Sequence, residues 1–478
     1  MHVDLRTMNS ELLPLGSVSS DDIDSGKAST SKELLVVISL LLGFCLVGLT
    51  HAKHYLEQHR HGVGVELGAG IDDQEKFEAN VNAAPVHRKL GFIGLLTVGA
   101  FCFFTSPRGS GLQLSFVLFW IMCCLFVVMA SYFWSFSRNE TARELVRIFA
   151  YAGVAYSLAI KFKPRELLTV IAIMSMTSVV FACVVDVVMG GKPWDPSYRL
   201  HGTIHSNLLA HQALVTMLVA FALYKTSSKP RVWLMVLGAM LMVIILTKTR
   251  GALASSLIGM AAIFLIGQSF RSFITVLSLT GFLLTAGVLL VVMVGSAAQQ
   301  RLSETAALGR SEGVGTLTGR IPLWSAIIKE SKDNRLKGYG YGAFWNSDRT
   351  IKLAKQLDWF PGHSHSAYVQ TVLDIGYFGA FTILMLVFAT IIRAAMLFFA
   401  TGNPAYKFVF GLLIAGLIDA FVEVSFVYPR ELGLFVGIVM FMLTVSHPDD
   451  AAEADPQQQG DDQLDSPQQS WRLVQPAY

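Results

Sequence analysis

Two histidines stand one residue apart where a polar stretch meets a long apolar run. The stretch reads FPGHSHSAYVQ, and its histidines are His363 and His365. Ser364 or Ser366 can cap a helix that starts here, and the positive end of that helix disfavours the imidazolium form. A neutral imidazole can take a proton from a hydroxyl group near pH 7. The pair therefore indicates a general base, although a lone histidine in such a position more often has a structural role.

Three arginines adjoin apolar segments in a way that suits an anion. Arg199 precedes LHGTIHSN, Arg250 lies in TKTRGA, and Arg320 lies in LTGRIPLW. A guanidinium group offers a planar fork that binds phosphate through two hydrogen bonds, and it keeps its charge. The structural alternative is that each arginine anchors a helix end at a membrane interface. Three such residues on one face, beside a basic loop, favour binding of a pyrophosphate.

The chain that must position these residues is strongly apolar. Of its 478 residues 53% are hydrophobic and only 15% are charged, whereas a soluble domain carries about 25% charged residues. Most of its apolar blocks approach the roughly 20 residues that cross a bilayer. The sequence therefore predicts an all-α, polytopic transmembrane helical bundle of about twelve spans. The blocks are residues 34–49, 90–104, 113–136, 143–160, 166–190, 207–224, 232–247, 252–267, 273–295, 376–400, 408–427 and 432–445.

The spans divide the chain into five parts. Both tails are expected in the cytoplasm, because basic turns such as KTSSKPR then lie inside, although several other basic residues then lie outside. Span parity puts the long loop on the external side. The acidic tail has almost no apolar content, so disorder is expected there. The parts are a polar cytoplasmic tail (1–33), the first nine spans (34–295), a large external loop (296–375), the last three spans (376–446) and the acidic cytoplasmic tail (447–478).

The external loop is basic and carries its own helix signals. Between residues 296 and 365 it has ten Lys or Arg against six Asp or Glu. Pro322 marks a first helical turn and Gly338 lies beyond the last one. A second short helix is expected within NSDRTIKLAKQLDW (residues 346–359), and a third after the two histidines. Amphipathic helices of this kind lie on a membrane surface, so the loop is expected to roof a space between spans.

Other polar features leave their roles open. Three acidic residues lie within apolar blocks: Asp186, Asp419 and Glu423. Placing an acidic side chain there costs free energy, and such residues are often functional. Asp419 and Glu423 share a helix face and can pair with a buried base or touch a substrate. The segment GYGYG (338–342) is best interpreted as a tight turn, because it lacks the context of a dinucleotide-binding loop. All five cysteines lie in apolar blocks without metal-ligand spacing. We expect no metal site and no cofactor.

The order of these motifs resembles that of the O-antigen ligase and polymerase family, bacterial integral-membrane glycosyltransferases. The resemblance runs from about residue 195 to 445. His365 falls on the family histidine, Ser366 stands where the family usually has Asn, Asp374 stands where it has Glu, and His363 is an additional histidine. The carrying stretches are RLHGTIHSN with Arg199, Gly202, Thr203 and Asn207; TKTRGA with Arg250; GRIPLW with Arg320, followed by GYG; and HSAYVQTVLDIG from His365.

The resemblance implies transfer of a glycan from an undecaprenyl-pyrophosphate carrier to a hydroxyl of a glycan or lipid acceptor. The enzyme would need neither nucleotide nor metal, would work at the periplasmic face of the bacterial inner membrane, and would have the bilayer but no nucleic acid as a partner. Catalysis would fall to His365. The pyrophosphate would be held by Arg199, Arg250 and Arg320. The auxiliary candidates are Asn207 and Tyr368, which lie in the matching stretches, and His363 and Glu423, which do not belong to the family motifs.

Two alternatives stay open at this stage. The first is a transporter or flippase for a lipid-linked or small solute, with Asp186, Asp419 and Glu423 as sites near the bilayer midplane. Inverted repeats and broken helices would mark such a protein, and the sequence displays neither. The second concerns the family itself, because ligases and polymerases differ in acceptor rather than in local motif. The sugar and the acceptor are not encoded in any motif of the sequence.

Overall fold

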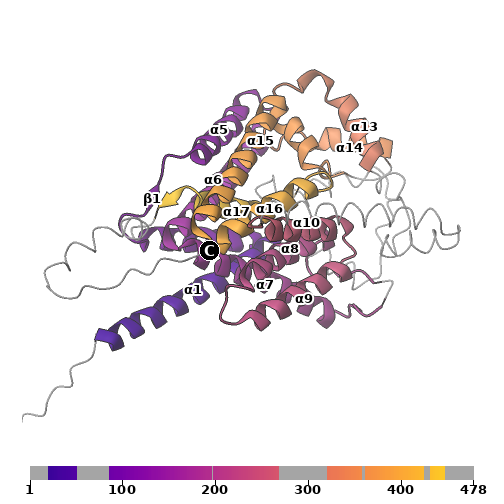
Figure 1. Ribbon diagram of the computed structural model, residues 1–478. Helices are drawn as coiled ribbons and strands as arrows, with labels where there is room; N and C mark the ends of the chain where they lie inside the picture. The colour runs from indigo at the N-terminus through magenta and orange to yellow at the C-terminus, as the bar shows by residue number, and fades with distance from the viewer. Residues whose placement is uncertain are drawn as a thin grey trace, which may run out of the picture.

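The computed structural model describes residues 20–50, 86–195, 198–268, 320–357, 361–424 and 431–446. These residues form thirteen α-helices, two short 3-10 helices and one antiparallel pair of two-residue strands, β1 (Gly111–Leu112) and β2 (Val445–Ser446) (Figure 1). The prediction of an all-α protein is therefore confirmed for the described chain. The predicted span at 273–295, most of the polar amino-terminal tail, the first part of the external loop and the acidic tail lie outside the described residues.

The first half of the chain builds one side of the bundle. Helix α1 (Ser20–Thr50) packs on α4 (Val86–Phe104) and α7 (Pro164–Val188), and α4 packs on α6 (Arg138–Lys161). A Cβ added to Gly91 would lie 2.8 Å from the carbonyl oxygen of Cys45, so the absence of a side chain lets α1 and α4 approach closely. Helix α5 (Phe116–Ala130) is followed by a 3-10 turn, η2 (Ser131–Trp134). These helices support the polar loops that the next subsection describes.

Helix α8 (Ser206–Leu223) lies at the centre of the bundle. It packs against α7, α9 (Pro230–Leu246), α10 (Arg250–Leu265) and α16 (Pro404–Asp419), and nearly all its side chains are buried. The helix is apolar around its whole circumference, which is the pattern of a buried helix. Helix α17 (Glu431–Met442) packs on α6. The central position of α8 matters because its amino-terminal end carries polar residues that the next subsection describes.

The described part of the loop that is predicted to be external folds over one end of the bundle (Figure 1). Helix α13 (Arg320–Glu330), a 3-10 turn η4 (Lys332–Asn334) and α14 (Ser347–Leu357) precede the long helix α15 (Ala367–Thr401). Buried apolar side chains join these elements into a small core separate from the main one: Leu323, Ile327, Tyr339, Phe344, Leu353 and Leu373. Asn346 caps α14 by accepting from the backbone N–H of Arg349. The first two predicted loop helices are therefore present as α13 and α14, whereas the third forms the first part of α15, before its break at Gly376.

Helix α15 is broken at Gly376, which has φ 69° and ψ −174°. The GYGYG turn lies against the break: the N–H of Tyr339 donates to the carbonyl of Leu373 (2.8 Å) and that of Gly340 to Asp374 (2.9 Å). On the other side, the N–H of Tyr377 donates to the carbonyl of Arg335 (2.9 Å). The tight turn expected from the sequence is present, and it packs against a broken helix that the sequence did not predict.

Six described helical segments are long and apolar enough to cross a membrane. They are Lys32–Thr50, Val86–Phe104, Phe116–Trp134, Pro164–Val188, Ser206–Leu223 and Ala367–Thr401, and shorter apolar helices cover Pro230–Leu246, Arg250–Leu265 and Gly433–Met442. Helix α6 is not among the six, because charged residues occupy its first three turns. The predicted span 408–427 differs from the structure, since α16 ends at Asp419 and the chain then turns. The total of about twelve spans stays a prediction.

Candidate active site

A polar cavity of about 210 Å³ lies where the ends of several helices converge. The start of α8, the start of α10, the start of α13, the residue two before α15 and the turn after α16 all reach it. Its lining is strongly charged for a protein of this composition. The lining residues are Arg199, His205, Asn207, His211, Lys248, Thr249, Arg250, Gly251, Ala252, Arg320, His365, Asp419, Val422 and Glu423. The structure thus brings the three predicted arginines and His365 to one cavity.

Arg199 is held in place by backbone and side-chain acceptors. Its Nε donates to the carbonyl of Thr247 at the end of α9 (2.8 Å), and its Nη2 donates to Oδ1 of Asn207 (2.7 Å). The loop that carries Arg199 is fixed by Asp186, which is buried near the end of α7. Asp186 accepts from the Tyr198 hydroxyl (2.8 Å) and from the N–H of Gly202 (2.7 Å). The role left open for Asp186 is therefore a structural one, and it lies outside the cavity.

Glu423 joins three parts of the site. Its Oε1 accepts from Asn207 Nδ2 (2.6 Å) and from Arg320 Nη2 (3.3 Å), and it lies 3.6 Å from Nδ1 of His365. Burial raises the pKa of the Glu423 carboxyl, but the nearby side chains of His365, His363 and His211 lower it further, so its pKa lies below the usual range. An ionised carboxylate therefore links α8, α13 and the histidine loop.

The backbone at His365 is unusual. His365 has φ 51°, and the only other non-glycine residue with positive φ in the described chain is Lys248, with φ 52°. Lys248 follows the last turn of α9, where a left-handed residue commonly ends a helix. His365 precedes a helix instead, so no such helix-ending role applies. Both residues line the cavity, and strained conformations of this kind concentrate at functional sites.

Trp324 and Gln370, which lie in motifs that resemble those of the family, hold the loop that carries His365. Trp324 of α13 donates from Nε1 to the carbonyl of Ser364 (2.8 Å). Oε1 of Gln370 accepts from the N–H of Ser364 (3.1 Å), and Nε2 of Gln370 donates to Asp374 (3.2 Å). Ser366 precedes the first helical residue, but its hydroxyl donates to the carbonyl of Ala420 (3.2 Å) rather than capping α15. These contacts tie α13 and the turn after α16 to the histidine loop.

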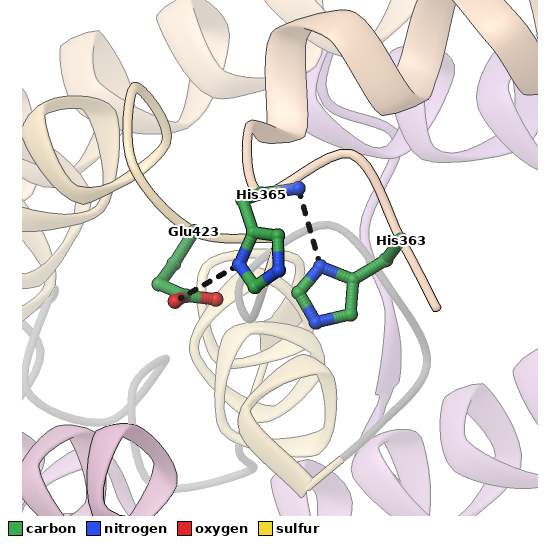
Figure 2. Close-up of side chains that lie close together, drawn as sticks. All are labelled: His363, His365 and Glu423. Carbon is green, nitrogen blue, oxygen red and sulfur yellow. Dashed lines mark hydrogen bonds and ion pairs between the residues drawn. The ribbon is translucent and has the colours of Figure 1, made fainter. Parts of the chain in front are cut away.

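The two histidines of the loop lie side by side (Figure 2). Nδ1 of His363 accepts from the backbone N–H of His365 (3.2 Å), and their ring centroids are 4.0 Å apart. In the neutral ring of His365, a proton on Nδ1 faces the Glu423 carboxylate, which leaves Nε2 as a proton acceptor. A carboxylate that orients a histidine in this way is a recurrent arrangement for general bases.

Tyr368 does not reach this cavity. Its hydroxyl donates to the carbonyl of Leu417 (2.8 Å) and its ring packs on Phe421. It lines instead a larger apolar cavity of about 560 Å³ between α5, α6, α15, α16 and α17. Ala367, two residues after His365, also lines that cavity, so an apolar space lies close to the charged one. Of the predicted auxiliary residues, Asn207 and Glu423 line the polar cavity and His363 lies against His365.

Residues 234–384 match the family model described as O-antigen ligase. This stretch, about a third of the chain, is similar to an O-antigen ligase domain. This match includes Arg250, Arg320 and His365, whereas Arg199, Asn207 and Glu423 lie outside it and reach the cavity through the fold. No curated protein matches the chain.

Two further histidines of the cavity, His205 and His211, were not predicted from the sequence. Nε2 of His211 lies 2.7 Å from Oδ1 of Asp419, and both side chains are fully buried. Nδ1 of His205 accepts from the N–H of Asn207 and caps α8. Desolvation by the surrounding protein and the charge of Arg199 lower the pKa of His205 to about 4, so it stays neutral although part of it is exposed to the cavity. The available signal was the spacing of His205, Asn207 and His211 on one helix start.

Proposed function

We propose that the chain is a glycosyltransferase that moves a glycan from an undecaprenyl-pyrophosphate carrier to an acceptor hydroxyl. The observation that carries the proposal is the meeting of three arginines with a carboxylate-linked histidine in one cavity. Such a cavity combines groups that bind a pyrophosphate with a group that accepts a proton. The similarity to an O-antigen ligase domain supports the same reaction class.

In the proposed reaction, Nε2 of His365 takes the proton of the acceptor hydroxyl while Nδ1–H faces Glu423. The hydroxyl oxygen attacks the anomeric carbon of the glycan and forms the new glycosidic bond. The bond between that carbon and the pyrophosphate oxygen breaks, and the electron pair leaves with the pyrophosphate. Arg199, Arg250 and Arg320 stabilise the charge that develops on the leaving group. The step uses no nucleotide and no metal, because the donor already carries its leaving group.

The surroundings of the cavity support a lipid-linked donor. Helices α8 and α15, which begin at or next to the site, are candidate membrane spans, so a headgroup at the membrane interface could reach the arginines. The neighbouring apolar cavity of about 560 Å³ suits hydrocarbon. We place the site at the periplasmic face of the bacterial inner membrane, with both tails in the cytoplasm. The proposal covers ligase and polymerase reactions alike, since these differ in whether the acceptor is another molecule or a growing chain.

One observation favours the transporter alternative: helix α15 is broken at Gly376. Carbonyl groups freed by a broken helix can bind a transported ion or solute. Here the carbonyls of Leu373 and Asp374 accept from the GYGYG turn instead. The acids proposed as transport sites are also engaged, Asp186 with its loop and Asp419 with His211. The glycosyltransferase therefore accounts for more of the site.

The test is glycan transfer in vitro by purified protein, with a lipid-pyrophosphate glycan and candidate acceptors. General-base assistance contributes about 10²- to 10⁴-fold, so His365→Ala should lower the rate at least a hundredfold without loss of expression or donor binding. His363→Ala is the matched control and should keep a measurable rate. An active His365→Ala beside an inactive His363→Ala would assign the role to the other histidine, and two fully active variants would refute histidine catalysis.

A further inference from the structure

We propose that His363, His365 and Glu423 form an inhibitory binding site for a divalent transition-metal ion of the zinc type. One nitrogen of each histidine and one oxygen of the carboxylate lie within 4.8 Å of one another. Figure 2 shows the three side chains converging from the histidine loop and from the turn after α16. The grouping combines two segments that are 58 residues apart in the chain, so the fold and not the sequence creates it.

The distance between two of the donor atoms fits a metal. Nδ1 of His365 and Oε1 of Glu423 are 3.6 Å apart. Two ligands at about 2.1 Å from a tetrahedral zinc ion are about 3.4 Å apart, so an ion can take the place of the proton between these atoms with little movement. Two imidazoles and one carboxylate are donors that zinc and its neighbours prefer. Magnesium and calcium prefer oxygen ligands throughout, so they should not bind here.

The surroundings set the strength of such a site. The rings of His363 and His365 are partly exposed, while Glu423 and the Nδ1 atom of His365 are buried, so an ion would enter past the exposed edges of the two rings. Arg320 lies 3.3 Å from the same carboxylate oxygen, and the charges of Arg199 and Arg250 also oppose a cation. Binding should therefore be weaker than at a structural zinc site, and reversible.

The inhibitory effect follows from the ring chemistry of His365 and rests on the proposed function; metal binding itself does not. A metal on Nδ1 uses the lone pair of that nitrogen, so the neutral ring must carry its proton on Nε2. Nε2 is then a hydrogen-bond donor and no longer a base. His363 supplies the third ligand and lies outside the family motif, so inhibition by metal should be a property that this additional histidine confers.

The first experiment measures binding without any activity. Purified protein without a histidine tag is treated with a chelator and titrated with Co²⁺, whose visible absorption reports tetrahedral coordination. Loss of even an outer-shell partner weakens metal binding about 10- to 100-fold, so His363→Ala should weaken the absorbing site by at least tenfold. His87→Ala, which removes a histidine of α4 outside the cavity, is the matched control for binding elsewhere. Equal titrations of wild type and His363→Ala would overturn the site.

The second experiment measures glycan transfer during a titration with Zn²⁺. Wild type and His87→Ala should be inhibited at the same concentration, His363→Ala should need at least tenfold more Zn²⁺ relative to its own metal-free rate, and Mg²⁺ should not inhibit. Equal inhibition of wild type and His363→Ala would overturn the inhibitory role. Stimulation by Zn²⁺ would do so as well. If no variant transfers glycan, the proposed function fails, while the Co²⁺ titration still decides whether the metal site exists.

Discussion

Replacing Gly376 by alanine should uncouple the loop helices α13 and α14 from the rest of the helical bundle. Gly376 occupies a backbone region (φ 69°, ψ −174°) that is almost restricted to glycine. A Cβ at this position would also overlap the carbonyl oxygen of Leu336. Because that contact is to backbone, no side-chain rotation can relieve it. The turn around Leu336 must therefore move away from α15.

The size of the effect follows from what the movement breaks. The conformation costs about 1–3 kcal/mol for a non-glycine residue. Three backbone hydrogen bonds cross the break, from Tyr339, Gly340 and Tyr377, and each contributes about 0.5–1.5 kcal/mol. The sum is about 2.5–7.5 kcal/mol, which approaches the stability of a whole small domain. The main core lies elsewhere, so the protein should still insert into the membrane.

Two measurements check this prediction. Glycan transfer should fall by about a hundredfold or more, because misplacement of a catalytic group by about 1 Å has an effect of that size. Limited proteolysis should cut α13 and α14 faster than in the wild type. The matched control is Gly402→Ala, since Gly402 also has a positive φ (66°) but no atom within 4 Å of an added Cβ. If Gly376→Ala transfers glycan within a few-fold of Gly402→Ala, the loop does not depend on the break.

The remaining predictions concern the charged residues. Arg250→Lys and Arg320→Lys keep the charge but lose the planar fork. Because a lost charge-assisted contact is worth about 1.5–3 kcal/mol, glycan transfer should fall about 10- to 100-fold. Near-normal rates in both variants would show that these arginines only anchor helix ends at the membrane interface. Asp186→Asn should loosen the hydrogen bonds to Tyr198 and Gly202 and so release Arg199. Its transfer rate should fall about tenfold at low donor concentration, and unchanged kinetics would exclude this positioning role.

Local patterns in the sequence are sufficient to predict the loop helices α13 and α14. Leu323 and Ile327 lie on one face of α13 at helical spacing, and both are fully buried in the loop core. Asn346 caps the next helix, α14. These features depend on contacts between residues that are near in the chain, so periodicity and capping preferences determine them. The ends of α16 and α17 depend on packing, and the predicted span 408–427 was therefore too long.

The sequence by itself determined that three arginines and two histidines sit at the ends of apolar segments, because residue type and hydropathy are properties of the chain. Only the tertiary structure decided which acid accompanies each of them. Asp186, Asp419 and Glu423 look alike in sequence, yet Asp186 fixes a loop, Asp419 pairs with His211, and Glu423 reaches His365. The contact between Glu423 and His365 joins residues 58 positions apart, and the turn after α16 and the break in α15 must both form before it exists. No local preference specifies such a distance, since it results from how the helices pack against one another.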